Sequence, residues 1–194
     1  KEKLGYVVAQ YTKRVLLSQY LKCNPQDVQI VVGPYGKPRL ADLNDGEGIN
    51  FNISQSRNYV LMALTRDRFI GADIEKIQSF PEMDIISKRF FSETEQLDWV
   101  KVAVEKRLET FFAIWTRKEA YMKAHGEGLR RNMTRFSVTF LPDAMIEVHD
   151  PHRSEGEGWR LIVPDAPSGY CAAIAVNNPV GIVRFFHGLP AQLN

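Results

Sequence analysis

The order of apolar and polar residues in the first third of the chain predicts one helix followed by several short strands. Residues 4–21 predict an amphipathic helix, because apolar side chains recur at spacings of three and four at Leu4, Val8, Tyr11 and Val15. Apolar and polar residues alternate along 49–54, as they do in a half-buried strand. Strand-like runs also occupy 27–32, 58–65 and 68–75. Their short connections favour antiparallel hairpins over parallel crossovers.

The middle of the chain, residues 82–125, has helical character. Ser92 and Glu95 have the Ser-x-x-Glu spacing of a capping box, which predicts that a helix begins at about residue 93. A second helix is predicted at about 107–125 and stops at Gly126, a residue type suited to the position after a helix end. Five strand-like segments follow, at 135–141, 144–149, 158–163, 170–177 and 180–186.

A helix followed by hairpin strands therefore occurs twice, which predicts an α+β fold of two similar halves. We place the N-terminal half at residues 1–67 and the C-terminal half at 68–194, each as a small antiparallel sheet packed with helices. Two halves within one chain can form a cleft without a second copy, so we expect a monomer.

Composition narrows the class of protein. Of the 194 residues, 44% are hydrophobic and 25% are charged, which is typical of a globular protein. Lys and Arg number 25 against 23 Asp and Glu, so the net charge of +2 does not indicate nucleic-acid binding, and any anion site must be local. No apolar run approaches the ~18 residues of a membrane span. Cys23 and Cys171 are too few for a disulfide scaffold, so we expect free thiols in a cytoplasmic protein.

The stretch GADIEKI, residues 71–77, places two carboxylates in a segment that is predicted to be a strand. Asp73 and Glu75 are two positions apart, so their side chains point from the same face of that strand. Two neighbouring carboxylates repel each other. The pair therefore needs a cation nearby.

The stretch WTRKEAYMK, residues 115–123, places Glu119 and Lys123 on one face of a predicted helix. On its own, such a pair is more often a surface ion pair worth about 0.3–0.5 kcal/mol. Together with Asp73 and Glu75, however, it supplies three carboxylates and one lysine. Mg²⁺ prefers a few carboxylates completed by substrate phosphates and water, and a lysine can bind the phosphate. This donor set indicates phosphoryl-type chemistry.

Two further segments give weaker indications of an anion site. YGKPRL presents Lys37 and Arg39 beside turn residues, and FNISQS ends in hydroxyl side chains that can donate to an anion. Each pattern is common in loops and at strand ends. The sequence contains no Gly-x-x-x-x-Gly-Lys loop and no protein-kinase signature, so the phosphate donor is not bound in either common nucleotide mode.

The order GKP, FNIS-x-S, GADIE, RFFSETE and WTRKEAYMKAHGEGL resembles the 4′-phosphopantetheinyl transferases of the Sfp type, over about residues 4–140. The motifs G-x-D-x-E and W-x-x-K-E-x-x-x-K are specific in combination. The resemblance implies transfer of the phosphopantetheine arm of coenzyme A to a serine of an acyl or peptidyl carrier protein, with Mg²⁺ and with release of 3′,5′-ADP. It also implies two α+β halves with pseudo-twofold symmetry.

The resemblance assigns roles to individual residues. The implied metal ligands are Asp73, Glu75 and Glu119. The implied contacts to coenzyme A come from Arg14, Lys37, Ser54, Gln55, Asp73 and Lys123, with Lys123 at the pyrophosphate. Arg14 and Lys37 suit the adenosine 3′-phosphate, which needs charge-assisted donors.

The implied catalytic residues are Glu95 and Lys123. The carrier serine attacks the β-phosphorus, Lys123 offsets charge on the leaving diphosphate, and Glu95 or a metal-bound water accepts the serine proton. From the spacing alone, Glu95 is equally well explained as the reach-back member of the capping box.

One position departs from the family pattern. Gln55 stands where the family usually has a histidine that contacts a coenzyme A phosphate. Glutamine donates a hydrogen bond but cannot carry a positive charge, so we expect weaker coenzyme A binding. Two alternatives stay open. Beside transfer, the chain could be a homologue that binds coenzyme A or a carrier protein without transferring the arm, which Gln55 favours, or another magnesium-dependent phosphohydrolase.

Overall fold

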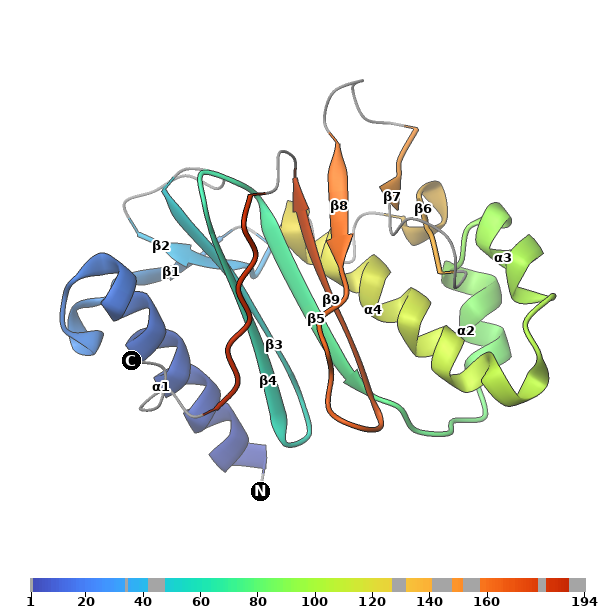
Figure 1. Cartoon of the computed structure of the whole chain (residues 1–194), viewed down its shortest axis with the longest axis horizontal. Coiled ribbons are helices and arrows are strands. Elements are labelled where there is room, and N and C mark those ends of the chain that lie inside the picture. Colours follow the sequence, from blue (N-terminus) through green and yellow to red (C-terminus); the bar gives the residue numbers. More distant parts are fainter. Residues whose placement is uncertain are drawn as a thin grey trace.

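The computed structural model describes residues 2–33, 35–41, 48–126, 132–140, 148–151, 158–177 and 181–188, with side chains from residue 7 onward. Helices α1 and α2–α3 lie at opposite ends of the molecule, with the long strands between them (Figure 1). The elements, in chain order, are α1 (Glu2–Leu21), η1 (Pro25–Asp27), β1 (Ile30–Val32), β2 (Pro38–Leu40), β3 (Ile49–Ser56), β4 (Tyr59–Arg66), β5 (Ile70–Lys76), α2 (Met83–Phe90), α3 (Glu93–Trp99), η2 (Val104–Lys106), α4 (Arg107–His125), η4 (Met133–Arg135), β6 (Ser137–Val138), β7 (Val148–His149), β8 (Trp159–Ile162) and β9 (Tyr170–Asn177).

The N-terminal part of the fold consists of α1 packed against the hairpin of β3 and β4. These strands pair antiparallel from Ile49↔Arg66 to Ser56↔Tyr59, and the tight connection between them places Arg57 at a positive φ of 52°. Their core is formed by Leu17, Val28, Leu40, Ile49 and Phe51. The hairpin thus presents one face to α1 and leaves the edge of β3 free to meet β5.

The buried face of α1 differs from the predicted one. Val8 and Tyr11 are 42% and 63% exposed, whereas Ala9, Lys13 and Leu17 are buried. At about 100° per residue, the predicted and the buried stripes lie on nearly opposite sides of the helix. The helix itself is confirmed, but packing against the hairpin selects the stripe that contains the fully buried Leu17.

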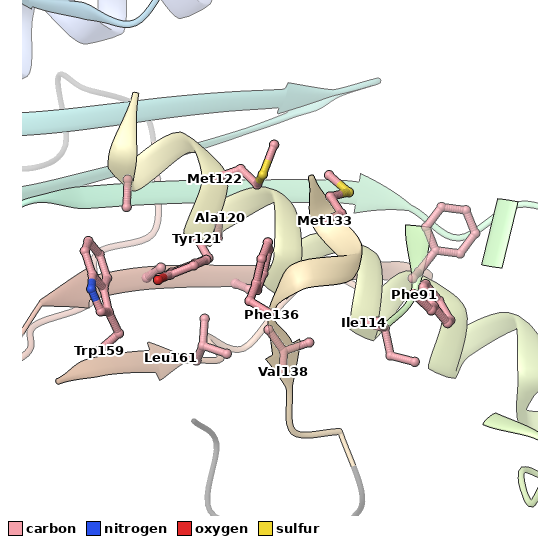
Figure 2. Packing of buried hydrophobic residues seen from close by; sticks show 14 of the residues in the cluster. Phe91, Ile114, Ala120, Tyr121, Met122, Met133, Phe136, Val138, Trp159 and Leu161 are labelled. Atoms are coloured by element: carbon pink, nitrogen blue, oxygen red, sulfur yellow. The ribbon is translucent and has the colours of Figure 1, made fainter. Parts of the chain in front are cut away.

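The C-terminal part of the fold is a three-stranded antiparallel sheet, in the order β5–β9–β8, that supports α4. β5 and β9 pair from Ile70↔Val176 to Lys76↔Tyr170. Figure 2 shows the core beside α4, where the ring of Tyr121 lies 4.7 Å from that of Phe136 and 5.1 Å from that of Trp159, between centroids. This packing holds α4 in place over β5.

β5 and α4 approach so closely that residue 71 has no room for a side chain. A Cβ atom on Gly71 would lie 2.0 Å from the backbone oxygen of Ala120 and 2.3 Å from the backbone nitrogen of Ala124. Glycine therefore lets the strand that carries Asp73 pass directly against the helix that carries Glu119 and Lys123.

We expect Gly71→Ala to lower the free energy of unfolding by about 1–3 kcal/mol or more, because the atoms in the way belong to the backbone of α4 and cannot rotate aside. Urea unfolding measures the loss. Gly181→Ala is the matched control, because an added methyl group there meets nothing within 4 Å. A Gly71→Ala protein as stable as this control would contradict the close approach.

β3 and β5 lie side by side and are joined by side chains, not by a backbone ladder. Asn52 Oδ1 accepts from the N–H of Ala72 at 2.9 Å, and Ser56 Oγ accepts from the N–H of Lys76 at 3.0 Å. Because contacts advance in the same direction on both strands, β3 and β5 run parallel. The polar side chains of β3 thus satisfy the edge of β5 that β9 leaves open.

The predicted hairpin between 58–65 and 68–75 is wrong. β4 pairs with β3, whereas β5 pairs with β9 from the far end of the chain. A short connection favours a hairpin only when no better partner exists. Here the small residues of β9, among them Ala173 and Ala175, allow α4 to pack across both strands.

Other predicted strands are shorter or absent. Within 27–32 only β1 is a strand, and within the described part of 135–141, residues 135–140, only β6 is; the 3₁₀ turns η1 and η4 take residues 27 and 135. Of 144–149, only the part that forms β7 is described. Of 180–186, the described residues 181–186 are exposed and form no strand, since no neighbouring strand pairs with them.

The α+β class, with small antiparallel sheets packed with helices, is confirmed. The boundary between residues 67 and 68 and the pseudo-twofold relation of the two halves stay predictions. In the described part of the chain, no helix is both long and apolar enough to cross a bilayer.

Candidate functional site

Asp73 lies at the point where β3, β5 and α4 meet. Lys123 Nζ donates to Asp73 Oδ1 at 2.6 Å and to Ser54 Oγ at 3.1 Å, and Ser54 Oγ donates to the same carboxylate oxygen at 2.9 Å. Asp73 is only 1% exposed, yet its second oxygen, Oδ2, is buried without a hydrogen-bond partner. A buried carboxylate oxygen without a hydrogen bond lowers the stability of the fold, unless a bound ligand supplies the missing interaction.

Glu75 lies two residues further along β5, on the same face as Asp73. Its Oε2 atom accepts a hydrogen bond of 2.9 Å from Ser56 Oγ. Burial is the main cause that raises the pKa of Glu75, and the neighbouring charge of Asp73 raises it further. The prediction that these two side chains share one face of a strand is confirmed.

Glu119 faces β5 from α4 and belongs to the same electrostatic cluster. Burial is the largest cause that raises the pKa of Glu119, and the charge of Asp73 is the second. Lys123 opposes both. Glu75 raises the pKa of Glu119 as well. Three carboxylates thus share one region with a single lysine side chain bonded to Asp73. Among the described residues, however, no three His, Cys, Asp or Glu side chains form a group ready to hold a metal ion.

Of the two other basic residues predicted to contact coenzyme A, Lys37 reaches the helix that carries this cluster, whereas Arg14 contacts other elements. Lys37, from the loop between β1 and β2, donates to the backbone oxygen of Ala124 at 2.8 Å and so reaches the end of α4 next to Lys123. Arg14 instead donates to the backbone oxygens of Pro25 and Val28, at 3.2 and 2.7 Å, which ties α1 to the turn that follows it.

Gln55 is exposed and lies between Ser54 and Ser56 on β3. Neighbouring residues of a strand point to opposite faces. The side chain of Gln55 therefore points away from the face that holds the two carboxylates.

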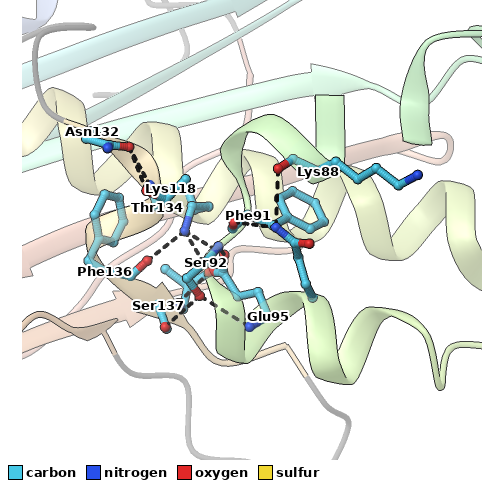
Figure 3. Close-up of polar contacts among 11 residues, drawn as sticks. Lys88, Phe91, Ser92, Glu95, Lys118, Asn132, Thr134, Phe136 and Ser137 are labelled. Carbon is cyan, nitrogen blue, oxygen red and sulfur yellow. Dashed lines mark hydrogen bonds and ion pairs between the residues drawn. The ribbon is translucent and has the colours of Figure 1, made fainter. Parts of the chain in front are cut away.

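Glu95 belongs to a second, fully buried polar cluster (Figure 3). The predicted capping box is confirmed, because Ser92 Oγ accepts from the N–H of Glu95 at 3.2 Å and Glu95 Oε2 accepts from the N–H of Ser92 at 2.7 Å. Both oxygens of Glu95 also accept from Lys118 Nζ, at 2.8 and 2.6 Å, and Oε1 accepts from the N–H of Val138 at 2.8 Å. This cluster joins α3, α4 and β6.

Lys118 and Ser56 also belong to these clusters, although the sequence assigned neither of them an individual role. Lys118 is 0% exposed and also donates to the backbone oxygen of Phe136 at 2.8 Å. Burial lowers its pKa, and Glu95 opposes that shift. A lysine in the middle of the apolar helix sequence FFAIWTRKEAYM was the available signal, because a buried lysine needs a carboxylate partner.

Residues 69–175 match the family model described as the 4′-phosphopantetheinyl transferase superfamily. The 4′-phosphopantetheinyl transferase HetI of Nostoc sp. is 31% identical over 176 residues, which cover 90% of this chain and 71% of HetI. The 4′-phosphopantetheinyl transferase Sfp of Bacillus subtilis is 33% identical over 138 residues, which cover 71% of this chain and 59% of Sfp. The chain thus spans about two thirds of the length of the curated relatives it matches.

Among solved structures, a holo-(acyl-carrier-protein) synthase from Bacillus anthracis in complex with CoA (3′,5′-ADP) is 20% identical. The alignment covers 57% of this chain and 96% of that chain, with a TM-score of 0.48. The family-model match contains the residues of both clusters that lie on β5, α3 and α4, and it spans more than half of the chain. With the identity to HetI, it establishes that this chain belongs to the 4′-phosphopantetheinyl transferase superfamily.

Proposed function

We propose that this chain transfers the 4′-phosphopantetheine group of coenzyme A to a serine of an acyl or peptidyl carrier protein, with Mg²⁺, and releases 3′,5′-ADP. The single observation that carries the proposal is Asp73 Oδ2, a buried carboxylate oxygen without a partner in a cluster of three carboxylates and one lysine. Family membership supports the substrate class, since the named relatives are phosphopantetheinyl transferases.

The residues present fit a divalent cation. Carboxylate oxygens are the ligands that Mg²⁺ prefers, and the charges of Asp73, Glu75 and Glu119 outnumber that of Lys123. Mg²⁺ usually keeps several waters and combines one or two protein carboxylates with substrate phosphates. A site that is completed by coenzyme A therefore does not require a closed group of three protein ligands beforehand. When bound, the ion neutralises charge on the phosphates as the P–O bond breaks.

Lys123 and Ser54 are the proposed groups for the pyrophosphate of coenzyme A. Lys123 is only half-buried, with its side chain 32% exposed, and its ammonium group already lies beside Asp73. An ammonium group has three donors, so Lys123 can hold Asp73 and a phosphate oxygen together. Lys37, whose side chain contacts the end of α4, and Arg14 are proposed for the adenosine 3′-phosphate.

The proposed reaction breaks one P–O bond and forms another. The carrier serine Oγ attacks the β-phosphorus of coenzyme A, its proton passes to a base, and the diphosphate bridge opens to release 3′,5′-ADP. Glu95 stays a candidate for that base, but both of its oxygens are bonded and it is 1% exposed. Its contacts support an anchoring role for α3, α4 and β6 at least as well.

The test is transfer of a labelled phosphopantetheine arm onto a purified carrier protein, followed by mass spectrometry. We expect transfer that depends on Mg²⁺. Transfer should fall at least about 100-fold in Lys123→Met, because the negative charge that develops on the departing 3′,5′-ADP is no longer offset. Lys101→Met is the control, since Lys101 makes only an exposed ion pair with Asp98. Equal transfer with and without Mg²⁺, after removal of bound metal, would contradict the proposal.

Gln55 favours a second candidate function, in which the chain binds coenzyme A or a carrier protein without transferring the arm. An exposed neutral side chain offers no charge to a phosphate. Calorimetry that detects coenzyme A binding, together with no turnover at high protein concentration, distinguishes this candidate from the first. Release of product from coenzyme A without any carrier protein would instead indicate a phosphohydrolase.

We also propose that the protein is a cytoplasmic monomer that binds neither nucleic acid nor membranes. The small net charge of +2 supports the absence of a bulk anion surface. The two cysteines are not joined to each other, as expected for a reducing compartment.

A further inference from the structure

Two serines of β3 repeat one contact on the two carboxylates of β5. Ser54 Oγ donates to Asp73 and Ser56 Oγ donates to Glu75, each at 2.9 Å. Both the serines and the carboxylates are two residues apart, so the parallel strands keep the same register at both contacts. Ser54 is part of the proposed phosphate site, whereas the residue that repeats its contact, Ser56, has no assigned role.

The hydroxyl group of Ser56 has a defined direction. Its oxygen accepts a hydrogen bond of 3.0 Å from the N–H of Lys76, on the edge of β5. A serine hydroxyl carries one hydrogen, so with this acceptor site taken its hydrogen points to Oε2 of Glu75. Ser56 thereby fastens a carboxylate to a backbone group of the same strand, and the partly buried side chain of Glu75 loses rotamer freedom.

This contact leaves the two oxygens of Glu75 in different states. Oε2 accepts from Ser56, while within the described residues no hydrogen bond is made to Oε1. Asp73 has the same asymmetry, with Oδ1 bonded to Ser54 and Lys123 and Oδ2 without a partner. One oxygen of each carboxylate is held by the protein, and the other is left for a ligand.

We propose that Ser56 is a positioning residue that orients Glu75 toward the divalent cation. The proposal rests on the proposed function, in which Glu75 is a cation ligand. Partners that hold a metal-ligating carboxylate from behind typically contribute 10–100-fold to metal affinity. The competing explanation is purely structural: Ser56 satisfies the N–H of Lys76 and so stabilises the seam between β3 and β5.

Ser56→Ala and Ser56→Thr separate these explanations. We expect Ser56→Ala to weaken binding of Mn²⁺, measured by electron paramagnetic resonance in the presence of coenzyme A, by about 10-fold or more. The Mg²⁺ concentration for half-maximal transfer rises by the same factor, while the rate at saturating Mg²⁺ changes less than about twofold. Ser56→Thr keeps the hydroxyl group and restores both values. Ser79→Ala, at an exposed serine after β5, is the matched control.

A double variant tests whether Ser56 acts through Glu75. In a Glu75→Gln background, Ser56→Ala is expected to cause no further loss of Mn²⁺ affinity, since the two residues belong to one interaction. Unchanged Mn²⁺ affinity in Ser56→Ala, or a loss that adds fully to that of Glu75→Gln, would overturn the proposal. A lower melting temperature with unchanged affinity would establish the structural explanation instead. If Asp73→Asn and Glu75→Gln also leave Mn²⁺ binding unchanged, the proposed function fails, not the role of Ser56 alone.

Discussion

Glu119→Gln is expected to lower transfer at least about 100-fold and, at the same time, to raise the stability of the metal-free protein. Both effects have one cause. Burial and the charges of Asp73 and Glu75 raise the pKa of Glu119, so in the folded, metal-free protein its ionised form is disfavoured. Glutamine keeps the shape of the side chain but removes the charge that the cation needs.

The raised pKa of Glu119 also determines the pH at which Glu119→Gln is more stable than the wild type. Because the folded pKa of Glu119 is raised, its contribution to stability is fully present below the unfolded pKa and is lost as pH rises through the folded pKa. We therefore expect Glu119→Gln to exceed the wild type by about 0.5–2 kcal/mol at pH 7–8 and to lose that advantage near pH 4. Thermal unfolding in a metal chelator measures it.

Added Mg²⁺ with coenzyme A should make the wild type more stable than Glu119→Gln, since a ligand stabilises only the protein that binds it. Glu109→Gln serves as the control, because Glu109 is an exposed residue of the same helix, and we expect no gain in stability there. Equal stability of Glu119→Gln and wild type at both pH values, together with full activity, would remove Glu119 from the site.

Lys118→Met is expected to lower the free energy of unfolding by about 3–5 kcal/mol, the loss typical of breaking a buried ion pair. Lys118 and Glu95 are 0% and 1% exposed, so the variant leaves the carboxylate of Glu95 buried without its counter-ion. The backbone oxygen of Phe136 loses its bond to Lys118 as well. Urea unfolding measures the loss.

Two further variants isolate the charge of Glu95. Glu95→Gln, added to Lys118→Met, removes the uncompensated charge but keeps an oxygen for only one of the two N–H groups, those of Ser92 and Val138, so it should recover part of the stability. Lys101→Met breaks an exposed pair and should cost little. A loss in Lys118→Met no larger than in Lys101→Met would show that the pair is not buried as described.

Local sequence signals predicted the elements that carry the site. The helix predicted at 107–125 is α4 with the same bounds, and Gly126 adopts the expected left-handed conformation, with φ of 69°. The capping box at Ser92 is formed. These features depend on hydrogen bonds within a few residues, and such bonds can be inferred from spacing alone.

Features that depend on distant partners could not be predicted in this way. The pairing of β5 with β9 joins segments that are far apart in the sequence, and no spacing rule connects them. The close approach at Gly71 depends on where α4 packs. Ser56 and Lys118 became meaningful only when Glu75 and Glu95 were seen beside them.

For the candidate site, spacing placed Asp73 and Glu75 on one face of a strand and Glu119 and Lys123 on one face of a helix. The structure brings these two faces together, and Ser54, which the family resemblance had already named, contacts both Asp73 and Lys123. The family resemblance is confirmed, whereas every role that it assigns to an individual residue stays a prediction.

Anomalous diffraction from crystals grown with Mn²⁺ and coenzyme A tests the shared cation site most directly. The account predicts one anomalous peak between β5 and α4, in contact with Asp73 Oδ2, at least one oxygen of Glu75 or Glu119, and the pyrophosphate. Bound coenzyme A with no such peak, or with the ion held away from all three carboxylates, would contradict it.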